Sequence, residues 1–380
     1  MTRRVAIIAD DLTGALDAGA PFAARGAKVL VATGLAAARD LMGSIEADQA
    51  DVIALNTESR HLGATAAAHA ARQAAEDLHD WRPDHWYKKI DSTLRGQVVA
   101  ETLALRDYLG KPLLFCPANP QQQRIMRNGR VQVAEQPIED TIYAVDDCSA
   151  ARTDPLRDQF ASAGVAMQLC QTNHNLPADP TDCIADAETP EDLVRIQTQA
   201  LLMRDRHPWI STGAGGLAKG LATCLFGGAA PTTRPPPPGD RRLYVVGSRN
   251  PRAIEQIAQL KAASPRTQHQ PKASSWQIVT PSQLADDEYS AEFVAAQLGE
   301  IAATAVAQWA ERSGLIVLCG GDIAIAVLRA LTISTLWLER EWLPGLPLAR
   351  ACNDPRLCVI TKPGGFGEAD LFAQLESTLS

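Results

Sequence analysis

Residues 5–25 read VAIIADDLTGALDAGAPFAAR and set the fold class of the chain. An apolar run at 5–9 ends at the adjacent carboxylates Asp10 and Asp11, and an alanine-rich stretch at 13–25 follows. A short buried strand, a polar turn and a helix give this order of residues. The stretch therefore predicts the first strand and helix of an α/β fold, with two aspartates at the carboxyl end of the strand.

The same alternation of short apolar runs and alanine- or leucine-rich stretches continues along the chain and predicts largely parallel sheets with flanking helices. Further strands are expected at 28–32, 52–55, 86–90, 113–116, 243–246, 277–279, 315–319 and 357–361. Further helices are expected at 64–78, 190–204, 251–260, 290–312 and 323–331. The stretch 121–186 shows no clear periodicity and receives no element.

The proline-rich segment PTTRPPPPGDRR at 231–242 divides the chain. Four consecutive prolines continue neither a helix nor a central strand, and they favour an extended spacer. The sequence thus predicts an N-terminal domain at 1–230, a linker at 231–241 and a C-terminal domain at 242–380. An active site is expected in the cleft between the two domains.

Composition and charge narrow the class of protein. The chain has 380 residues, with 36 Lys and Arg against 44 Asp and Glu, a net charge of −8. This acidic balance argues against a nucleic-acid or anionic-membrane partner. No signal peptide or membrane span is indicated, and the eight cysteines form no CxxC pair. We therefore expect a cytoplasmic enzyme without a structural zinc site.

Three glycine-containing turns in the second half each follow a predicted strand and open a helix. They read VVGSRNP at 245–251, with Asn250 expected to cap its helix, CGGDIA at 319–324, with Asp322 as the expected cap, and TKPGGFG at 361–367. At the carboxyl edge of a parallel sheet, such turns can bind the phosphates of a nucleotide. Each turn alone could instead be only a tight connection.

The common nucleotide-binding motifs do not account for these turns. The sequence has no GxxxxGK[ST], which excludes a P-loop enzyme. The segment GAGGLA at 213–218 matches GxGxxA, but no acidic residue follows at the distance that a dinucleotide-binding fold requires. We interpret it as a turn that leads into a helix.

Two polar clusters follow strands of the first half. Asp10 and Asp11 could hold the hydroxyls of a polyol, or Asp11 could cap a helix while Asp10 is solvated. In KKIDSTLRG at 88–96, Arg95 could bind a carboxylate and Asp91 could take or orient a hydroxyl proton. Alternatively, Asp91 or Ser92 caps a helix that begins near Thr93, and the lysines are surface charges.

The motifs ADDLTGA (9–15), KKIDSTLRG, VVGSRNP, GGDIA (320–324), the PG pair at 344–345 and TKPGGFG together resemble the four-carbon acid sugar kinase family. The resemblance covers nearly the whole chain. It implies an ATP-dependent kinase acting on threonate, erythronate or 3-oxo-tetronate. We further expect Mg²⁺ as a cofactor, a small-molecule substrate and a homo-oligomer as a possible assembly. The sugar-acid site would comprise Asp10, Asp11, Lys89, Asp91, Ser92 and Arg95, with Asp91 and Arg95 catalytic. The nucleotide site would comprise Ser248, Gly320, Gly321, Asp322, Ile323, Gly345, Gly364 and Gly365; no metal ligand is assigned.

Two departures from the family pattern support an alternative function. Ile323 stands where the family has threonine, and Pro363 stands where it has serine, which removes one backbone donor. The alternative is a catalytically impaired protein of the same fold that binds a sugar acid. A nicotinamide-dependent oxidoreductase, resting on the GxGxxA match, is a more distant hypothesis.

Overall fold

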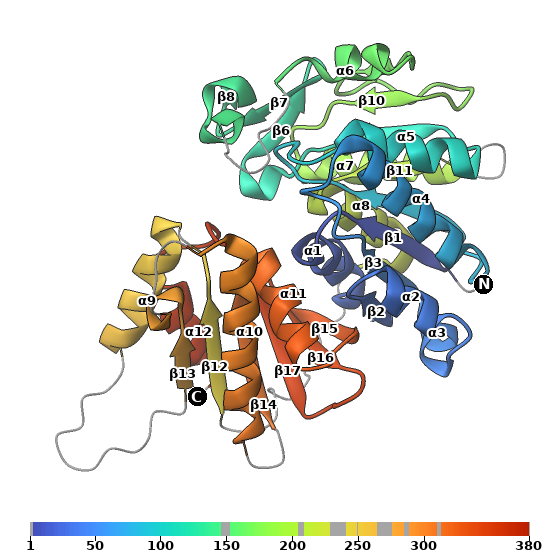
Figure 1. The fold of residues 1–380 in the computed structure, drawn as a ribbon. Helices are drawn as coiled ribbons and strands as arrows, with labels where there is room; N and C mark the ends of the chain where they lie inside the picture. Colours follow the sequence, from blue (N-terminus) through green and yellow to red (C-terminus); the bar gives the residue numbers. More distant parts are fainter. Residues whose placement is uncertain are drawn as a thin grey trace. The chain divides into compact units, whose positions relative to one another are not determined.

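The computed structural model describes residues 3–145, 153–203, 209–228, 241–248, 250–263, 276–284, 289–309 and 313–379. The chain forms two compact units, Met1–Ala230 and Pro231–Ser380, and each is an α/β structure (Figure 1). Of the predicted linker at 231–241, only Arg241 belongs to the described residues. Within the described part of the chain, no helix has the length and apolar character needed to cross a membrane.

Among its described residues, the first unit contains a sheet of eight parallel strands. All of them except the edge strand at 168–170 are buried on both faces, as in parallel sheets covered by helices. In spatial order the strands are β2 (Val29–Ala32), β3 (Val52–Asn56), β1 (Val5–Ala9), β4 (His85–Lys89), β11 (Ile210–Gly213), β5 (Leu113–Cys116), β10 (Cys183–Ala185) and β9 (Gln168–Cys170).

Helices cover both faces of this sheet. One group packs together around α1 (Leu12–Ala23), α7 (Pro190–Leu202) and α8 (Gly215–Phe226), and the other around α2 (Leu35–Leu41), α4 (Ala64–His79) and α5 (Val98–Leu109). A short α3 (Ile45–Gln49) precedes β3. In the sheet, β2 and β3 lie on one side of β1, and β4 lies on the other side. The order in which the chain adds strands therefore reverses beside β1. Ligands of open α/β sheets bind at the carboxyl edge beside such a reversal.

The stretch 121–186, for which the sequence predicted no element, contains short ones. A small antiparallel sheet is formed by β6 (Arg124–Arg127), β7 (Arg130–Val133) and β8 (Gln136–Pro137). The other elements there are η1 (Pro120–Gln122), η2 (Ile138–Asp140), η3 (Ile142–Val145), α6 (Leu156–Ser162), β9 and β10. Asp186 accepts hydrogen bonds from the backbone N–H groups of Asn128 and Gly129, at 2.7 and 2.9 Å, and ties the hairpin to the end of β10.

The described residues of the second unit form a six-stranded, largely parallel sheet. Its parallel strands, in spatial order, are β13 (Trp276–Val279), β12 (Arg242–Val246), β14 (Gly314–Cys319) and β17 (Leu357–Lys362). The sequence did not predict the antiparallel hairpin of β16 (Leu346–Ala351) and β15 (Thr335–Leu343), which extends the sheet beside β17. Gly345 forms its turn with a φ of +76°, a backbone conformation that favours glycine.

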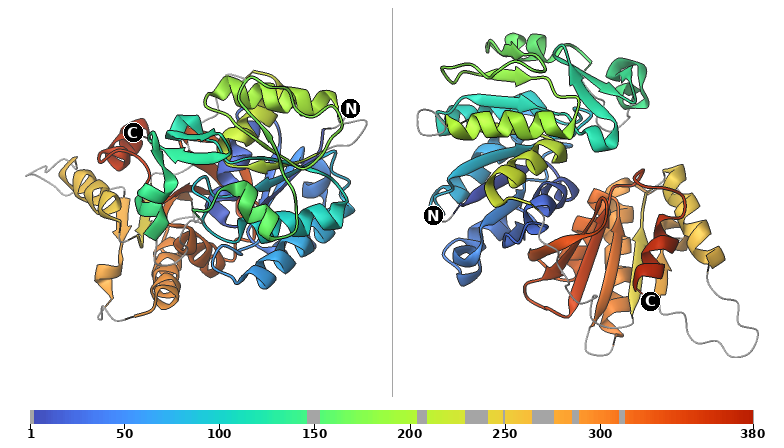
Figure 2. Two further views of the ribbon diagram at one scale, coloured as in Figure 1. Left: turned by 90° about the horizontal axis from the view of Figure 1, so that it is seen from above. Right: turned by 180° about the vertical axis from the view of Figure 1, so that it is seen from behind.

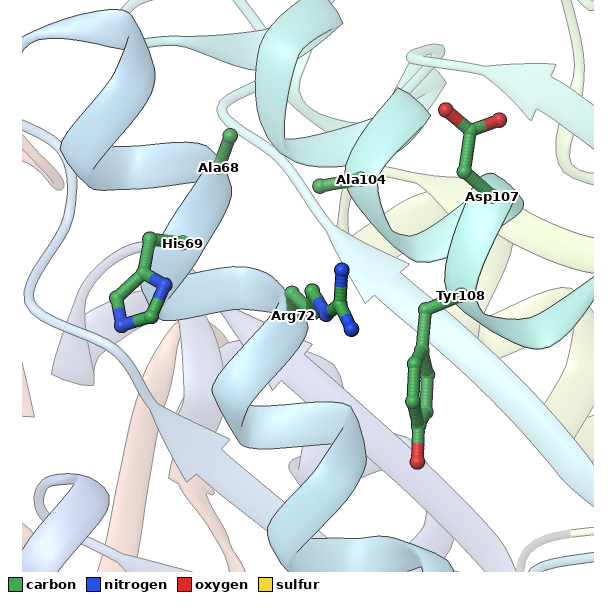
Figure 3. Close-up of a pocket in the computed structure, with 6 residues that line it drawn as sticks. All are labelled: Ala68, His69, Arg72, Ala104, Asp107 and Tyr108. Carbon is green, nitrogen blue, oxygen red and sulfur yellow. The ribbon is translucent and has the colours of Figure 1, made fainter.

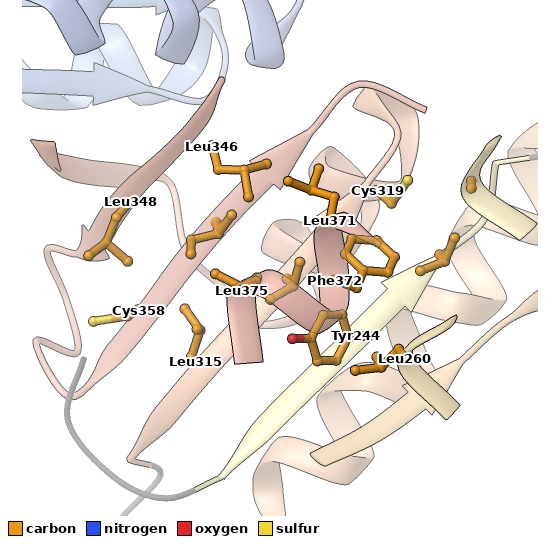
Figure 4. Packing of buried hydrophobic residues seen from close by; sticks show 14 residues of the cluster. Tyr244, Leu260, Leu315, Cys319, Leu346, Leu348, Cys358, Leu371, Phe372 and Leu375 are labelled. Atoms are coloured by element: carbon orange, nitrogen blue, oxygen red, sulfur yellow. The ribbon is translucent and has the colours of Figure 1, made fainter. Parts of the chain in front are cut away.

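Two pairs of helices cover this second sheet (Figure 2). On one face, α9 (Pro251–Ala263) and α12 (Leu371–Leu379) enclose a core in which the rings of Tyr244 and Phe372 lie 5.1 Å apart, edge to face (Figure 4). On the other, α10 (Ala291–Ala307) packs against α11 (Gly321–Ala330), and a short η4 (Pro281–Gln283) precedes α10.

The predicted fold class, two largely parallel α/β domains with flanking helices, is confirmed. Several boundaries differ. The helix predicted at 290–312 spans Ala291–Ala307, and residues 310–312 lie outside the described part; the helix predicted at 190–204 spans Pro190–Leu202, and residue 204 lies outside it too.

Candidate functional site

The loops after β1, β3 and β4 lie at the carboxyl edge of three adjacent strands of the first unit. After β1, the carboxylate of Asp11 accepts a hydrogen bond from the backbone N–H of Gly14 at 2.8 Å and another from the hydroxyl of Thr13. Asp11 is thus the N-cap of α1. Asp10 is not solvated, contrary to the simpler interpretation of the sequence, because only 3% of its surface is exposed.

Arg60, which follows β3, pairs with both aspartates. Its Nε and Nη2 donate to the two carboxylate oxygens of Asp10 at 2.8 and 2.9 Å, and its Nη1 donates to Asp11 at 2.7 Å. Burial alone would raise the pKa of Asp10, but the charge and hydrogen bonds of Arg60, helped by the neighbouring lysines, hold that pKa below its usual value. Asp10 is therefore a carboxylate at neutral pH.

Residues 91–97, after β4, form a turn and not the start of a helix. The alternative interpretation, in which Asp91 or Ser92 caps a helix that begins near Thr93, is wrong, since α5 begins at Val98. Asp91 instead accepts from the backbone N–H and hydroxyl of Thr93, and Leu94 and Gly96 have positive φ angles of +62° and +83°. This conformation keeps the polar side chains of the motif at the strand end.

Asp91 and Arg95 pair with each other inside that turn. Nε and Nη2 of Arg95 donate to the two oxygens of Asp91 at 3.0 and 2.9 Å. Burial alone would raise the pKa of Asp91, but the charges of Arg95 and Arg60 and the hydrogen bonds from Arg95 and Thr93 hold it well below its usual value. The two residues predicted to be catalytic thus form one ion pair.

The two lysines of the motif point to different surroundings, and neither is a surface charge. Lys89 is buried near the start of α1; its Nζ donates to the carbonyl of Ile90 at 2.9 Å and lies 3.8 Å from the carboxylate of Asp17. Lys88 forms a 2.6 Å ion pair with Glu101, and each side chain is 1% exposed. A Cβ atom on Gly14 would lie 2.5 Å from the carboxylate of Asp11 and 3.4 Å from Nζ of Lys89, which places Lys89 in the cluster, whereas Lys88 is paired with Glu101 inside the fold.

One cluster in the first unit therefore brings together Asp10, Asp11, Lys89, Asp91, Ser92 and Arg95, with Ser92 half-buried in the same turn. Sequence reasoning missed Arg60, whose charge acts on Asp91 as well as on Asp10. Its position after the predicted strand at 52–55 was the available signal, because the carboxyl ends of parallel strands share one edge.

The three glycine turns of the second unit are in mutual contact. A Cβ atom on Gly364 would lie 2.3 Å from Oγ of Ser248, and one on Gly365 would lie 2.9 Å from the side-chain amide of Asn250. A Cβ atom on Gly247 would lie 2.3 Å from Cδ1 of Ile323. The turns after β12, β14 and β17 therefore form one surface in which the glycines leave room for their neighbours.

The turn after β14 differs from the prediction in one respect. Asp322 does not cap α11, because the N-cap is Gly320, with a φ of +112°, and the helix begins at Gly321. Asp322 is exposed in the first helical turn. Ile323 is buried against Gly247, so its side chain takes no part in the exposed surface of the turn.

The last turn is joined to the hairpin of β15 and β16. A Cβ atom on Gly345 would lie 2.1 Å from the ring of Phe366. Gly345 therefore lies against the turn at 363–367, and the eight residues predicted for the nucleotide site surround the ends of β12, β14 and β17.

The GxGxxA segment has a structural explanation. α8 begins at Gly215, as expected of a turn that leads into a helix. A Cβ atom on Gly213 would lie 2.2 Å from the carbonyl oxygen of Cys116, and one on Gly215 would lie 2.4 Å from the carboxylate of Asp17. Close packing of strand and helix thus accounts for these glycines.

Neither cluster gains residues from the surface hollow of the first unit or from a metal-binding group of side chains. A surface hollow between α4 and α5 is lined by Ala68, His69, Arg72, Ala104, Asp107 and Tyr108, none of them a predicted site residue (Figure 3). Among the described residues, no three His, Cys, Asp or Glu side chains form a group that could hold a metal by itself. Mg²⁺ bound with a nucleotide takes most of its ligands from phosphate and water, so a nucleotide-bound Mg²⁺ does not require such a group.

Comparison with known proteins agrees with this division into two sites. Residues 5–221 match the model of a sugar-binding N-terminal domain, and residues 266–372 match that of a nucleotide-binding C-terminal domain. The chain is 31% identical over 408 residues to a D-threonate kinase of Bordetella bronchiseptica, covering 97% of this chain and 95% of the relative. It is also 31% identical over 415 residues to a D-threonate kinase of Cupriavidus necator, covering 95% and 94%.

A solved structure is similar over the same extent. It is a domain of unknown function from Bordetella bronchiseptica, crystallised with bound citrate as a domain-swapped dimer. The two chains are 28% identical with a TM-score of 0.53, and the match covers 99% of this chain and 98% of that one.

Proposed function

This chain belongs to the four-carbon acid sugar kinase family, and on that premise we propose that it transfers a phosphoryl group from ATP to a hydroxyl of D-threonate. The observation that carries the proposal is that one chain contains both kinds of site. The sugar-binding domain has a buried cluster of carboxylates and guanidinium groups, and the nucleotide-binding domain has three glycine turns in mutual contact. D-threonate is the first choice among four-carbon acids because two relatives of nearly full length are D-threonate kinases.

The cluster in the first unit offers what a sugar acid requires. Such a substrate carries one carboxylate and several hydroxyls, and Lys89, Arg60 and Arg95 supply cationic donors for the carboxylate. Asp10 and Asp91 are ionised and can accept hydrogen bonds from hydroxyls. Citrate, bound in the related Bordetella bronchiseptica structure, is also a hydroxy acid, which supports a ligand of that chemical class.

Asp91 is our choice for the residue that receives the hydroxyl proton, and Arg95 holds it in place. As the substrate oxygen forms its bond to the γ-phosphorus, the bond from that phosphorus to the bridging oxygen breaks and ADP leaves. The hydroxyl proton passes to the carboxylate of Asp91. Phosphoryl transfer depends mainly on positioning and on stabilisation of charge, so a base with a low pKa is compatible with it.

The second unit supplies the nucleotide site of this proposal. Ser248 and the glycines of the three turns would surround the phosphates of ATP, with backbone N–H groups as donors. Mg²⁺, when bound, would neutralise charge on the transferred phosphate, and Asp322 is the carboxylate beside the turns that could hold it. We propose that residues 320–322 and 364–365 bind the nucleotide together, with Ile323 packed beneath them.

Two remaining expectations are also part of this proposal. The domain-swapped dimer of the Bordetella bronchiseptica relative supports a homo-oligomer for this chain as well.

The alternative of a catalytically impaired protein rested on Ile323 and Pro363. Ile323 is buried against Gly247. The absence of a hydroxyl at this position therefore changes the packing inside the turn more than it changes the hydrogen-bond donors that the turn exposes.

A coupled assay of ADP release tests the proposal. The protein is incubated with Mg²⁺ and ATP and with each of D- and L-threonate, D- and L-erythronate and the 3-oxo acids, with a reaction lacking acid as the control. We expect turnover with D-threonate above that with every other acid. Turnover with another acid of the panel would correct the substrate, and no turnover together with thermal-shift evidence of acid binding would favour the impaired protein.

A further inference from the structure

Lys362, the last residue of β17, is fully buried beneath the third glycine turn. None of its surface is exposed, and its Nζ donates to the backbone carbonyls of Pro363, Gly364 and Phe366 at 2.9, 2.9 and 3.0 Å. An ammonium group has three donors, and here three carbonyls of one turn accept from it. The three hydrogen bonds of Lys362 Nζ therefore fix the backbone conformation of the turn.

This arrangement fixes the direction of the peptide N–H groups. In a trans peptide the C=O and the following N–H point in opposite directions, and the described residues contain no cis peptide. Carbonyls directed at Nζ therefore turn the N–H groups of Gly364, Gly365 and Gly367 away from it. In the part of the chain that the structure describes, none of these three N–H groups has a hydrogen-bond acceptor, whereas the N–H of Phe366 donates to the carbonyl of Pro363.

Two further contacts anchor the turn from the inside. The buried side chain of Gln256, on α9, donates to the carbonyls of Phe366 and Glu368 at 3.0 and 2.8 Å. The carbonyl of Lys362 itself accepts from the N–H of Gly320 at 3.0 Å, which links this turn to the one after β14. Pro363 lacks an N–H, but its carbonyl still serves Lys362, so this departure from the family pattern leaves the arrangement intact.

We propose that Lys362 is a positioning residue of the nucleotide site, whose buried ammonium holds the N–H groups of Gly364, Gly365 and Gly367 toward the phosphates of the nucleotide. The inference rests on the proposed function for the identity of the ligand. Lys362 does not itself contact a phosphate, because its donors are directed at the turn. Its role resembles that of a hydrogen-bonded group that orients the ligands around a bound ion.

The first test measures binding without turnover. ADP and D-threonate are titrated separately by calorimetry into the full-length wild type, Lys362→Met and Gln256→Leu. Gln256→Leu is the matched control, since it also removes hydrogen bonds to carbonyls of the turn but leaves those at Pro363 and Gly364. We expect the Kd for ADP to rise at least tenfold in Lys362→Met and less than threefold in Gln256→Leu, with the Kd for D-threonate unchanged in both.

A second measurement uses only the wild type and so does not depend on the folding of a variant. Amide NMR signals of Gly364, Gly365 and Gly367 should shift on addition of ADP, and their exchange with solvent should slow, while the amide of Phe366 changes least. Unperturbed glycine amides would overturn the proposal, as would equal loss of ADP binding in the two variants. Perturbed amides without turnover on any sugar acid would leave this proposal standing and contradict the proposed function instead.

Discussion

Arg60 holds Asp10 through two parallel hydrogen bonds, although the two residues lie fifty positions apart in the chain. The side chains are 13% and 4% exposed, so the pair is largely withdrawn from water. A planar guanidinium fork matches a carboxylate in this way, and lysine does not reproduce it. The pair joins the loop after β3 to the loop after β1 and gives the sugar-acid cluster its shape.

Replacement of Arg60 by lysine or methionine should therefore affect both stability and substrate binding. Arg60→Met leaves Asp10 as a buried charge without its main partner, which costs about 3 kcal/mol of unfolding free energy. Arg60→Lys keeps the charge but not the fork, and we expect kcat/KM for the sugar acid to fall at least tenfold. Urea unfolding and steady-state kinetics measure the two effects. Arg72→Met, which removes an exposed arginine on α4, is the control; a wild-type KM in Arg60→Lys would contradict the assigned role.

The low pKa of Asp91 predicts a specific pH dependence. Because the folded pKa lies well below the ordinary value of 3.8, the ion pair with Arg95 contributes its full stabilisation above that value, and this contribution is lost progressively as the pH falls from there through the folded pKa. The difference in unfolding free energy between wild type and Asp91→Asn should be constant from about pH 5 to 8 and shrink below about pH 4. Urea unfolding at a series of pH values measures it.

The same substitution tests the catalytic role of Asp91. We expect kcat of Asp91→Asn to fall by about 100-fold or more, as for loss of a general base. In the wild type, kcat/KM should show no inflection from Asp91 above about pH 5. Retained affinity for the sugar acid together with near-normal turnover in Asp91→Asn would remove this residue from the mechanism.

The parts of the fold that the sequence predicted are those with local signals. The apolar run at 5–9 and the aspartate before α1 specify a strand and a capped helix within a few residues. The three glycine turns were equally visible, because each joins an apolar run to a helical stretch. Parallel pairing of the strands alone brings these turns to the same edge of the sheet, and in the structure the turns are in contact.

The features that the sequence did not predict depend on distant contacts. The role of Arg60 arises from its pairing with Asp10, and its position after the strand at 52–55 indicates the edge of the sheet but not the partner. The false helix near Thr93 and the false cap at Asp322 have related causes, since positive φ angles at Leu94, Gly96 and Gly320 place the helix starts elsewhere. The hairpin at 335–351 was missed because β15 contains the consecutive charged residues 339–341 and β16 contains Pro347, neither of which is typical of a strand.

Ile323 should prove to be a packing residue. Its side chain fills the space beside Gly247, so Ile323→Thr removes apolar contacts and buries a hydroxyl, which costs about 1–3 kcal/mol of unfolding free energy. The KM for ATP should change less than threefold, because the side chain is not directed at the exposed surface of the turn. Thermal unfolding and kinetics with varied ATP measure both. A tenfold gain in kcat on restoring the threonine would instead show that Ile323 impairs the enzyme.

Gly364 provides the sharpest test of the contact between two glycine turns. A Cβ atom there would lie 2.3 Å from Oγ of Ser248 and 3.0 Å from its Cβ, so Gly364→Ala must displace the side chain of Ser248 and crowd the contact between the turns after β12 and β17. We expect the KM for ATP to rise at least tenfold, while the KM for the sugar acid stays within twofold. Gly63→Ala is the matched control, because a Cβ atom at that residue would meet nothing within 4 Å and its φ of −65° suits alanine. Steady-state kinetics with each substrate varied in turn distinguish the two variants, and equal KM values for ATP in both would show that the spacing of the turns is unimportant for nucleotide binding.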